Sequence, residues 1–296
     1  MASKQKSRDR MNRFFIVVML FIPIVHWFIF WLGVNVNSIL MAFQIPTGEW
    51  SMQSMQDAIR SLADSESNIR IAVKNTLLYF TKDLFFMVWH VIISYFFFKK
   101  IKFYRGFQII FYLPGIVSGL AIASAFRQFV APYGPLGVLL SNMGVDPVPE
   151  FFVESKYATW TILFYTVWLG WAGNMLLFGG AMARIPLELL ESARLDGIRL
   201  WQELIFMVVP LIWPTMSTLL ILNLTGIFGA GGPILLFTKG AAKTTTIGYW
   251  IFDKIKYHGT AAYNEVSAVG LLFTLVGVPV ILFFKWLIEK IPVVDY

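Results

Sequence analysis

The stretch IPLELLESARLDGIRLWQELIFMVVPLIWP, residues 185–214, decides how the chain folds. It is dense in charge, although it lies between two long apolar runs without any charged residue, 158–183 and 204–230. Runs of that length are expected to cross a bilayer, so the charged segment between them must lie in water at the membrane surface. We call residues 184–203 the elbow.

The elbow is predicted to be two helical segments with a break between them. An amphipathic helix is expected from Leu187 to Leu195, with Glu188, Glu191 and Arg194 on its solvent side. Gly197 supplies a break that no side chain hinders, and a second helical segment begins near Arg199. A charged helix–glycine–helix segment of this kind is suited to contact a partner in the aqueous phase.

Further along the same stretch, Pro210 and Pro214 fall inside the next apolar run. Neighbouring helices can accommodate a bend at such prolines within a membrane. A bent rather than straight segment is therefore expected there.

The composition of the chain indicates an integral membrane protein. Of its 296 residues, 57% are hydrophobic and only 14% are charged, against about 25% charged in an ordinary globular domain. The absence of cysteine excludes a disulfide scaffold and any cysteine-ligated metal. The formal charge of +7 does not indicate nucleic-acid binding, because the basic residues lie at the ends of apolar runs rather than in one patch.

Six apolar runs are long enough to cross about 30 Å of hydrocarbon. They lie near 14–34, 71–98, 107–130, 158–183, 204–230 and 264–288. The first is expected to be an anchor rather than a cleaved signal peptide, because it is long and no small-residue cleavage site follows it. The sequence therefore predicts an all-α membrane protein with a single six-helix transmembrane domain over 1–296.

The distribution of basic residues predicts the orientation of the chain. Basic residues precede the first span, separate the second and third, occupy the elbow and follow the sixth: Lys4, Lys6, Arg8, Arg10, Arg13, Lys99, Lys100, Lys102, Arg105, Arg184, Arg194, Arg199, Lys285 and Lys290. By the positive-inside rule, both termini and the elbow are cytoplasmic. A basic cluster in the last outer loop, 231–263, dilutes this bias: Lys239, Lys243, Lys254 and Lys256.

The elbow resembles the EAA loop of the membrane subunits of binding-protein-dependent ABC importers. In that family E-A-A is followed by three residues, G, nine residues and I-x-L-P. The matching positions here, with the same spacing, are Glu191, Ser192, Ala193, Gly197, Met207, Val209 and Pro210. Ser192, Met207 and Val209 depart from the pattern by similar residues. With Asp196-Gly197 and Gly231-Gly232-Pro233, the chain is most similar to the maltose-type sugar permeases.

This resemblance implies a type I importer permease in the cytoplasmic (inner) membrane of a bacterium. Its expected partners are a second, similar permease, two ATPase subunits, an external solute-binding protein, membrane lipid and the sugar. No G-x-x-x-x-G-K-[ST] motif occurs, so ATP and Mg²⁺ are expected on the ATPase chains, with no cofactor and no catalytic residue on this one. The residues expected to couple it to the ATPase are Glu188, Glu191, Ser192, Ala193, Asp196 and Gly197.

Polar and aromatic residues inside the fourth and fifth spans suggest a sugar pathway. Amides and hydroxyls bind sugar hydroxyl groups, and aromatic faces stack on sugar C–H surfaces, although the same composition also serves helix packing. The resemblance places the sugar pocket on these spans. The expected pathway residues are Thr166, Leu169, Gly170, Gly173, Asn174, Asn223, Gly226 and Phe228.

Three ionisable residues in the second span, Lys82, Asp83 and His90, leave an alternative open. Buried ionisable groups in a membrane indicate function by default, and Asp83 and His90 share a helix face, as a proton-coupled transporter would require. The plainer expectation pairs Lys82 and Asp83 with charges in the outer loops. An ABC permease for a solute other than sugar is a further alternative, and the sequence names neither the sugar nor the role of the outer basic cluster. No metal-ligand spacing occurs.

Overall fold

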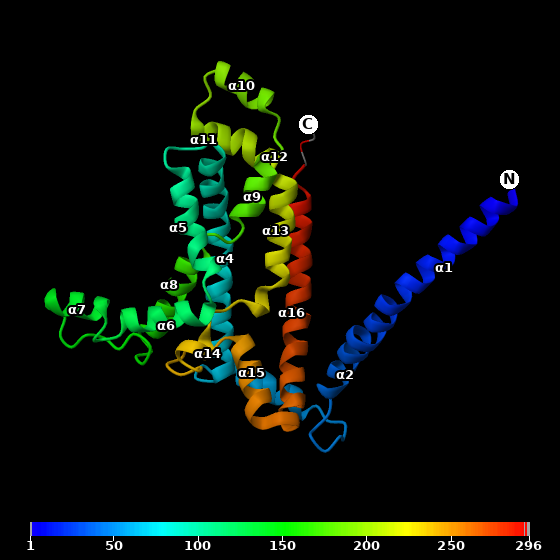
Figure 1. The fold of residues 1–296 in the computed structure, drawn as a ribbon. Helices are drawn as coiled ribbons and strands as arrows, with labels where there is room; N and C mark the ends of the chain where they lie inside the picture. The colour runs from blue at the N-terminus through cyan, green and yellow to red at the C-terminus, as the bar shows by residue number, and fades with distance from the viewer. Residues whose placement is uncertain (1, 293, 295–296) are drawn as a thin grey trace. The chain divides into compact units, whose positions relative to one another are not determined.

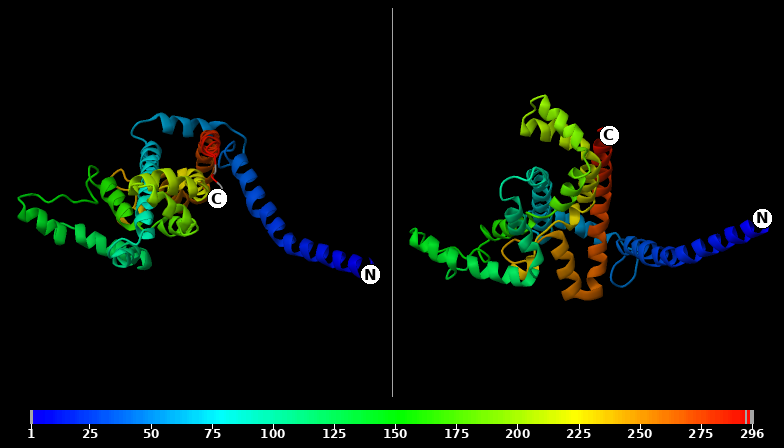
Figure 2. Two further views of the ribbon diagram at one scale, coloured as in Figure 1. Left: turned by 90° about the horizontal axis from the view of Figure 1, so that it is seen from above. Right: turned by 45° about the horizontal axis from the view of Figure 1, so that its top comes forward.

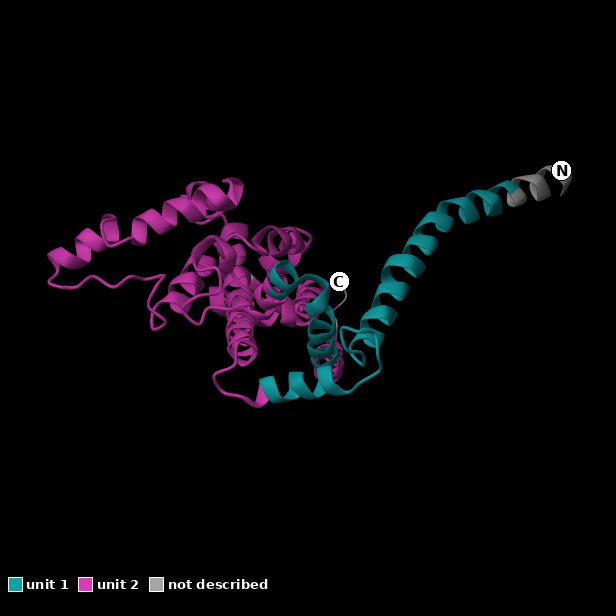
Figure 3. Cartoon of the chain, turned by 90° about the horizontal axis from the view of Figure 1, so that it is seen from below, with its two compact units in different colours: residues 1–61, 254–274 teal, residues 62–253, 275–296 magenta. Residues whose placement is uncertain are grey.

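The computed structural model describes residues 2–292 and 294, with side chains from residue 11 onward except that of Arg194. Every regular element in that part of the chain is a helix, as predicted. The helices form two compact units, residues 1–61 with 254–274 and residues 62–253 with 275–296 (Figure 3). Four helical segments are long and apolar enough to cross a membrane, and six are if each of two bent helix pairs is one span.

The first unit contains the predicted first span. Helix α1 (Ala2–His26) continues through a π-helical stretch (Trp27–Gly33) into α2 (Val34–Met41). Helix α3 (Gln53–Ala63) begins in the same unit. Residues 263–274 of α16 (Tyr263–Glu289) also lie there, and the Asn264 side-chain amide donates to the Met41 carbonyl at 3.0 Å.

The second unit is organised around α4 (Asn68–Phe98), the predicted second span. Ser67 caps its N-terminus by accepting a hydrogen bond from the Arg70 amide, and the helix then continues unbroken for 31 residues. Helix α4 packs most extensively against α9 (Met175–Met182). One buried apolar cluster joins these helices to the elbow and to the segment after it: Met87, Val91, Tyr95, Phe178, Ala181, Met182, Ile185, Leu190, Leu204, Val208, Ile212 and Leu219.

The third predicted span, 107–130, is not one continuous helix. Helix α5 (Tyr104–Ile116) ends where the backbone of Val117 and Ser118 becomes extended, and α6 (Gly119–Val130) sets off at 101° to it. Pro114 weakens the last turn of α5 because it has no amide to donate. Figures 1 and 2 show α6 and α7 (Pro135–Asn142) turning away from the direction of α5, so the segment between the third and fourth predicted spans also contains a helix.

The fourth and fifth predicted spans are helical but interrupted. Helix α8 (Ala158–Gly170) is separated from α9 by a turn over 171–174. After the elbow helices α10 (Leu187–Leu195) and α11 (Leu200–Glu203), a π-helical stretch (Leu204–Val208) leads into α12 (Val209–Leu211). The chain bends by 74° before α13 (Trp213–Thr225), which confirms the bend predicted at the prolines.

The remaining outer segment was predicted as a loop over 231–263, and it contains two further helices. They are α14 (Ile234–Phe237) and α15 (Ile247–His258). Within the second unit, the elbow, the loop after α4 and the C-terminal part of α16 lie at one end, and α14 lies toward the other (Figure 1). The basic segments of this unit that the sequence assigned to the cytoplasm thus share one end.

Candidate functional site

The elbow forms the two helices that the sequence predicts. Helix α10 covers Leu187–Leu195, the expected bounds, and α11 begins at Leu200. Along α10, Leu190 and Ala193 are buried within the second unit, whereas Glu188, Glu191 and Ser192 are exposed. The Ser192 hydroxyl donates to the Leu189 carbonyl at 3.0 Å, so it is occupied within the helix.

The exposed face of α10 carries an acidic residue between two apolar ones. Leu187, Glu191 and Leu195 follow one another at four-residue spacing and therefore lie along one stripe of the helix. Leu187 is 64% exposed and Leu195 is 89% exposed. Among the described side chains, Glu191 forms no ion pair. Large apolar side chains that are exposed together are typical of a surface that a partner covers.

Gly197 ends α10 in the conformation that favours glycine. Its φ is +77°, and the Ile198 amide donates to the Ala193 carbonyl at 3.2 Å, which is the long hydrogen bond of a Schellman cap. A Cβ atom at position 197 would meet nothing within 4 Å. The requirement for glycine is therefore one of backbone conformation and not of space.

Four of the six predicted coupling residues border one hollow of about 570 Å³. They are Ser192, Ala193, Asp196 and Gly197, and the hollow is also lined by Ile198, Gln202, Phe206 and Met207. Glu188 and Glu191 are not among its lining residues and lie on the exposed face of α10. The elbow thus presents both a protruding stripe and a concavity.

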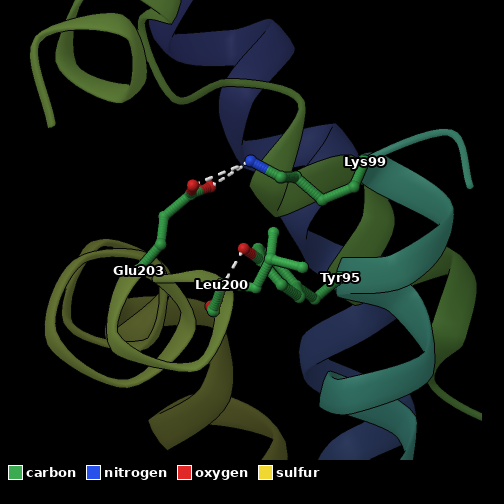
Figure 4. A network of polar contacts seen from close by, with 4 residues as sticks. All are labelled: Tyr95, Lys99, Leu200 and Glu203. Carbon is green, nitrogen blue, oxygen red and sulfur yellow. Dashed lines mark hydrogen bonds and ion pairs between the residues drawn. The ribbon is translucent and has the colours of Figure 1, made fainter. Parts of the chain in front are cut away.

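The sequence did not indicate the contact that holds α11 against α4. The Lys99 ammonium lies 2.6 and 2.8 Å from the two carboxylate oxygens of Glu203, and the Tyr95 hydroxyl donates to the Leu200 carbonyl at 3.1 Å (Figure 4). The side chains of Glu203 and Lys99 are only 2% and 10% exposed. The available signal was a charged residue at the boundary of each apolar run, after 71–98 and before 204–230.

A second hollow, of about 500 Å³, lies among α4, α13 and the turn before α9. It brings together three of the predicted pathway residues, Asn174, Asn223 and Gly226, with Phe80 and Asp83 of α4. The other lining residues are Leu219, Leu222, Gly229 and Ala230. We call this hollow the pathway hollow.

The other predicted pathway residues lie elsewhere. The Thr166 hydroxyl donates to the Leu163 carbonyl, and Leu169 packs at the edge of an apolar cluster that includes Tyr165. The Phe228 ring lies against Gly277, where a Cβ atom would not fit. Their part in transport stays a prediction, and their contacts are those of packing residues.

Gly170 and Gly173 support His90. The His90 Nε2 atom lies 2.8 Å from the Gly170 carbonyl, and a Cβ atom on Gly173 would come within 2.8 Å of His90 Cε1. The hydrogen bond helps to satisfy a carbonyl next to the break between α8 and α9, as interrupted helices in membranes require. His90 is therefore fixed by the backbone of α8.

Lys82 and Asp83 pair with each other and not with outer-loop charges as expected. The Lys82 ammonium lies 2.5 Å from an Asp83 carboxylate oxygen. Asp83 also lines the pathway hollow, whereas His90 does not. The structure therefore does not place the two proposed relay residues in one hollow.

The outer basic cluster divides into separate contacts. Lys243 pairs with Glu66 at 3.1 Å, and both side chains are largely exposed. Lys254 pairs with Glu265 at 2.8 Å. No group of three or more acidic or histidine side chains suited to a metal occurs among the described residues.

Comparison with known proteins gives two informative relatives. The chain is 30% identical to the probable ABC transporter permease protein MG188 of Mycoplasma genitalium over 258 residues, which cover 83% of this chain and 74% of that protein. It is 26% identical to the galactooligosaccharides transport system permease protein GanP of Bacillus subtilis over 199 residues, 64% of this chain and 46% of that protein. No protein-family model matches the chain.

Two solved structures have a similar fold. A bacterial ABC transporter involved in the import of the acidic polysaccharide alginate includes a chain with a TM-score of 0.79 and 24% identity, with coverage of 97% of this chain and 99% of that one. A bacterial alginate ABC transporter in complex with an alginate pentasaccharide-bound periplasmic protein gives a TM-score of 0.73 and 23% identity, with coverage of 93% and 94%. At this identity the likeness concerns the fold.

Proposed function

We infer the function of this chain from its family, because it belongs to the permease subunits of binding-protein-dependent ABC importers of the carbohydrate type. It is a multi-pass protein of the bacterial cytoplasmic membrane and a transport subunit without catalytic activity of its own. Its fold is that of an ABC importer permease. What it carries and how it is driven are the subject of the proposal.

We propose that the elbow is the surface on which a cytoplasmic ATPase acts. The observation that carries this proposal is the stripe of Leu187, Glu191 and Leu195 beside the hollow bordered by Gly197. The leucines supply apolar area to a partner, and Glu191 supplies a charge for a basic side chain of the partner to pair with. The capped turn at Gly197 holds this surface in a fixed shape, which a docking helix needs if it is to transmit force.

The pathway hollow is proposed to bind the transported solute, an oligosaccharide or related glycoside. Asn174 and Asn223 offer both donors and acceptors to hydroxyl groups, Asp83 offers acceptors, and the Phe80 ring offers a face. The glycines leave room for a ring. Among the described residues that line the hollow none is basic, and the Asp83 carboxylate already pairs with Lys82. The hollow therefore offers no cation to an acidic sugar and favours one rich in hydroxyl groups.

The complete importer is proposed to contain a second permease, two ATPase subunits that bind ATP and Mg²⁺, and an external solute-binding protein. Closure of the ATPases on ATP would move the elbows together and favour the outward-open pathway. Hydrolysis would then return the pathway to the inward-open state. Nucleotide acts here as the ligand that shifts a population between two conformations.

The test is purification of the chain from its native membrane followed by reconstitution in proteoliposomes. The expected result is stable association with an ATPase and sugar uptake that needs ATP and the binding protein. Competition between neutral and uronate oligosaccharides then tests the solute class, with the neutral sugar expected to compete better. Uptake by the isolated chain in a pH gradient, without an ATPase, would contradict the proposal and support a proton-coupled transporter.

A further inference from the structure

We propose that the ion pair between Lys99 and Glu203 is the rigid link through which the elbow moves α4 and thereby the pathway hollow. Lys99 and Glu203 are then positioning residues of the transport cycle. This inference rests on the proposed function, because it takes the elbow to be the surface on which the ATPase acts. It goes beyond that function by naming the contact that transmits motion from the elbow to the spans.

The contact between α4 and α11 includes three interactions within about one turn of each helix. The Glu203 carboxylate receives both of its contacts from the Lys99 ammonium, at 2.6 and 2.8 Å. The Tyr95 hydroxyl donates to the Leu200 carbonyl, and the Phe96 and Trp201 rings meet edge to face with centroids 5.6 Å apart. Figure 4 shows the charged and the hydroxyl contacts side by side between the two helices.

The charges of the pair suit the helix ends that they occupy. Lys99 caps the C-terminus of α4, where a cation is favoured, and Glu203 lies in the first turn of the helical segment that begins at Leu200, where an anion is favoured. Both side chains are nearly excluded from solvent, so loss of one partner leaves the other as a buried charge. Such a pair resists separation and fixes one register between the helices.

Helix α4 is the straight connection from this contact to the pathway hollow. Phe80 and Asp83 of α4 line the hollow, and Lys99 follows Asp83 by 16 residues, or about 24 Å along an α-helix. No break interrupts α4 between these positions. A displacement imposed at Lys99 is therefore delivered to the hollow.

The polypeptide segment that leads from the elbow along the chain to the same hollow is less rigid than α4. It runs through a π-helical stretch over Leu204–Val208 and a bend of 74° before it reaches Asn223 on α13. Such irregular segments absorb motion more readily than a continuous helix. The two routes converge on one hollow, and the ion pair connects the stiffer of them.

The test uses the complete transporter with one reporter cysteine, because the chain has none of its own. Asn223→Cys places the reporter in the pathway hollow, and its labelling by a membrane-impermeant maleimide from outside is measured with and without a non-hydrolysable ATP analogue. In this background, Glu203→Gln is expected to reduce the nucleotide-driven rise in labelling at least fivefold. ATPase co-purification and ATP hydrolysis should stay within twofold of the parent. Glu66→Gln, which removes the exposed pair with Lys243, is the matched control and should change nothing.

The charge-exchanged double variant Lys99→Glu/Glu203→Lys provides the second arm. Its nucleotide-driven rise in labelling should recover more than half of what each single charge reversal loses. Recovery should be incomplete, because the exchanged charges no longer suit the helix ends at which they lie. Three outcomes would each overturn the inference. Glu203→Gln could leave the nucleotide-driven rise in labelling unchanged, the double variant could assemble without recovering that rise, or all these variants could fail to assemble. If the parent itself shows neither nucleotide-dependent labelling nor an associated ATPase, the proposed function fails instead.

Discussion

Substitution of Gly197 tests whether the shape of the elbow matters for coupling. The residue has a φ of +77°, and open space surrounds the position of a Cβ atom. An ordinary L residue costs about 1–2 kcal/mol in this left-handed region, asparagine costs less, and a β-branched residue costs more. The cost comes from the backbone, since no described atom lies within 4 Å of the Cβ position.

This cost converts into a graded loss of function. A penalty of about 1–2 kcal/mol shifts the equilibrium away from the capped turn by a factor of roughly 5–30. Gly197→Val is expected to reach or exceed that range, Gly197→Ala to fall within it, and Gly197→Asn to remain within a few-fold of the parent. The assay is ATP-driven uptake together with ATPase co-purification in the reconstituted transporter.

The order of the three variants separates two explanations. The backbone explanation predicts Asn above Ala above Val, whereas a clash with the docked partner would rank the variants by size and place Ala above Asn. Gly179→Ala is the matched control, because Gly179 lies within α9 without a positive φ and also has no atom within 4 Å of its Cβ position. Wild-type uptake and assembly in Gly197→Val would refute the reasoning.

Three further outcomes are expected. Gly173→Ala would displace the His90 ring, which costs about 1–3 kcal/mol and should lower the melting temperature of the purified chain by several degrees. Gly170→Ala is the control, because open space surrounds its Cβ position, and it should change the melting temperature little. Equal melting temperatures for the two variants would contradict the packing role of Gly173. Asn223→Ala removes an amide from the pathway hollow and should lower maximal sugar uptake by about tenfold while ATPase association stays constant; undiminished uptake would exclude the amide from the pathway. Glu191→Lys reverses the charge on the exposed stripe and should reduce ATPase co-purification more than tenfold, while membrane insertion stays normal. Retention of the ATPase would show that Glu191 does not contact the ATPase.

The local features of the elbow could be predicted because short-range rules determine them. The bounds of α10, the break at Gly197 and, just after the elbow, the bend near Pro210 each follow from residues within one or two helical turns. The resemblance to the family added a role for these residues. It did not supply their geometry.

The contacts between distant segments could not be predicted in the same way. Glu203 and Lys99 are 104 residues apart, and a charge at the edge of an apolar run usually faces solvent. The change of direction between α5 and α6 occurs within an apolar run that, by composition, continues as one span. Gly173 is an expected pathway residue, but the His90 side chain, which belongs to a different helix, fills the space beside it.

The pathway hollow illustrates both cases. Asn174, Asn223 and Gly226 were expected on composition and family resemblance, and they lie together. Asp83 was expected near outer-loop charges, and it lines the same hollow because α4 passes beside α13. Helix packing determines which of the expected residues line the same hollow. That packing cannot be inferred from the pattern of residues in a single sequence.

The most direct test of the account is cross-linking from position 195 in the native assembly. Leu195 is 89% exposed on α10, and the thiol of a Leu195→Cys variant would be the only one in the chain. A short bifunctional thiol reagent should join this thiol to the ATPase subunit. A Lys243→Cys variant, at a position predicted to lie on the outer side, should give no such product. Labelling of the Leu195→Cys variant in intact cells by a membrane-impermeant reagent, with no cross-link to an ATPase, would contradict the assignment of the elbow as the cytoplasmic contact of the motor.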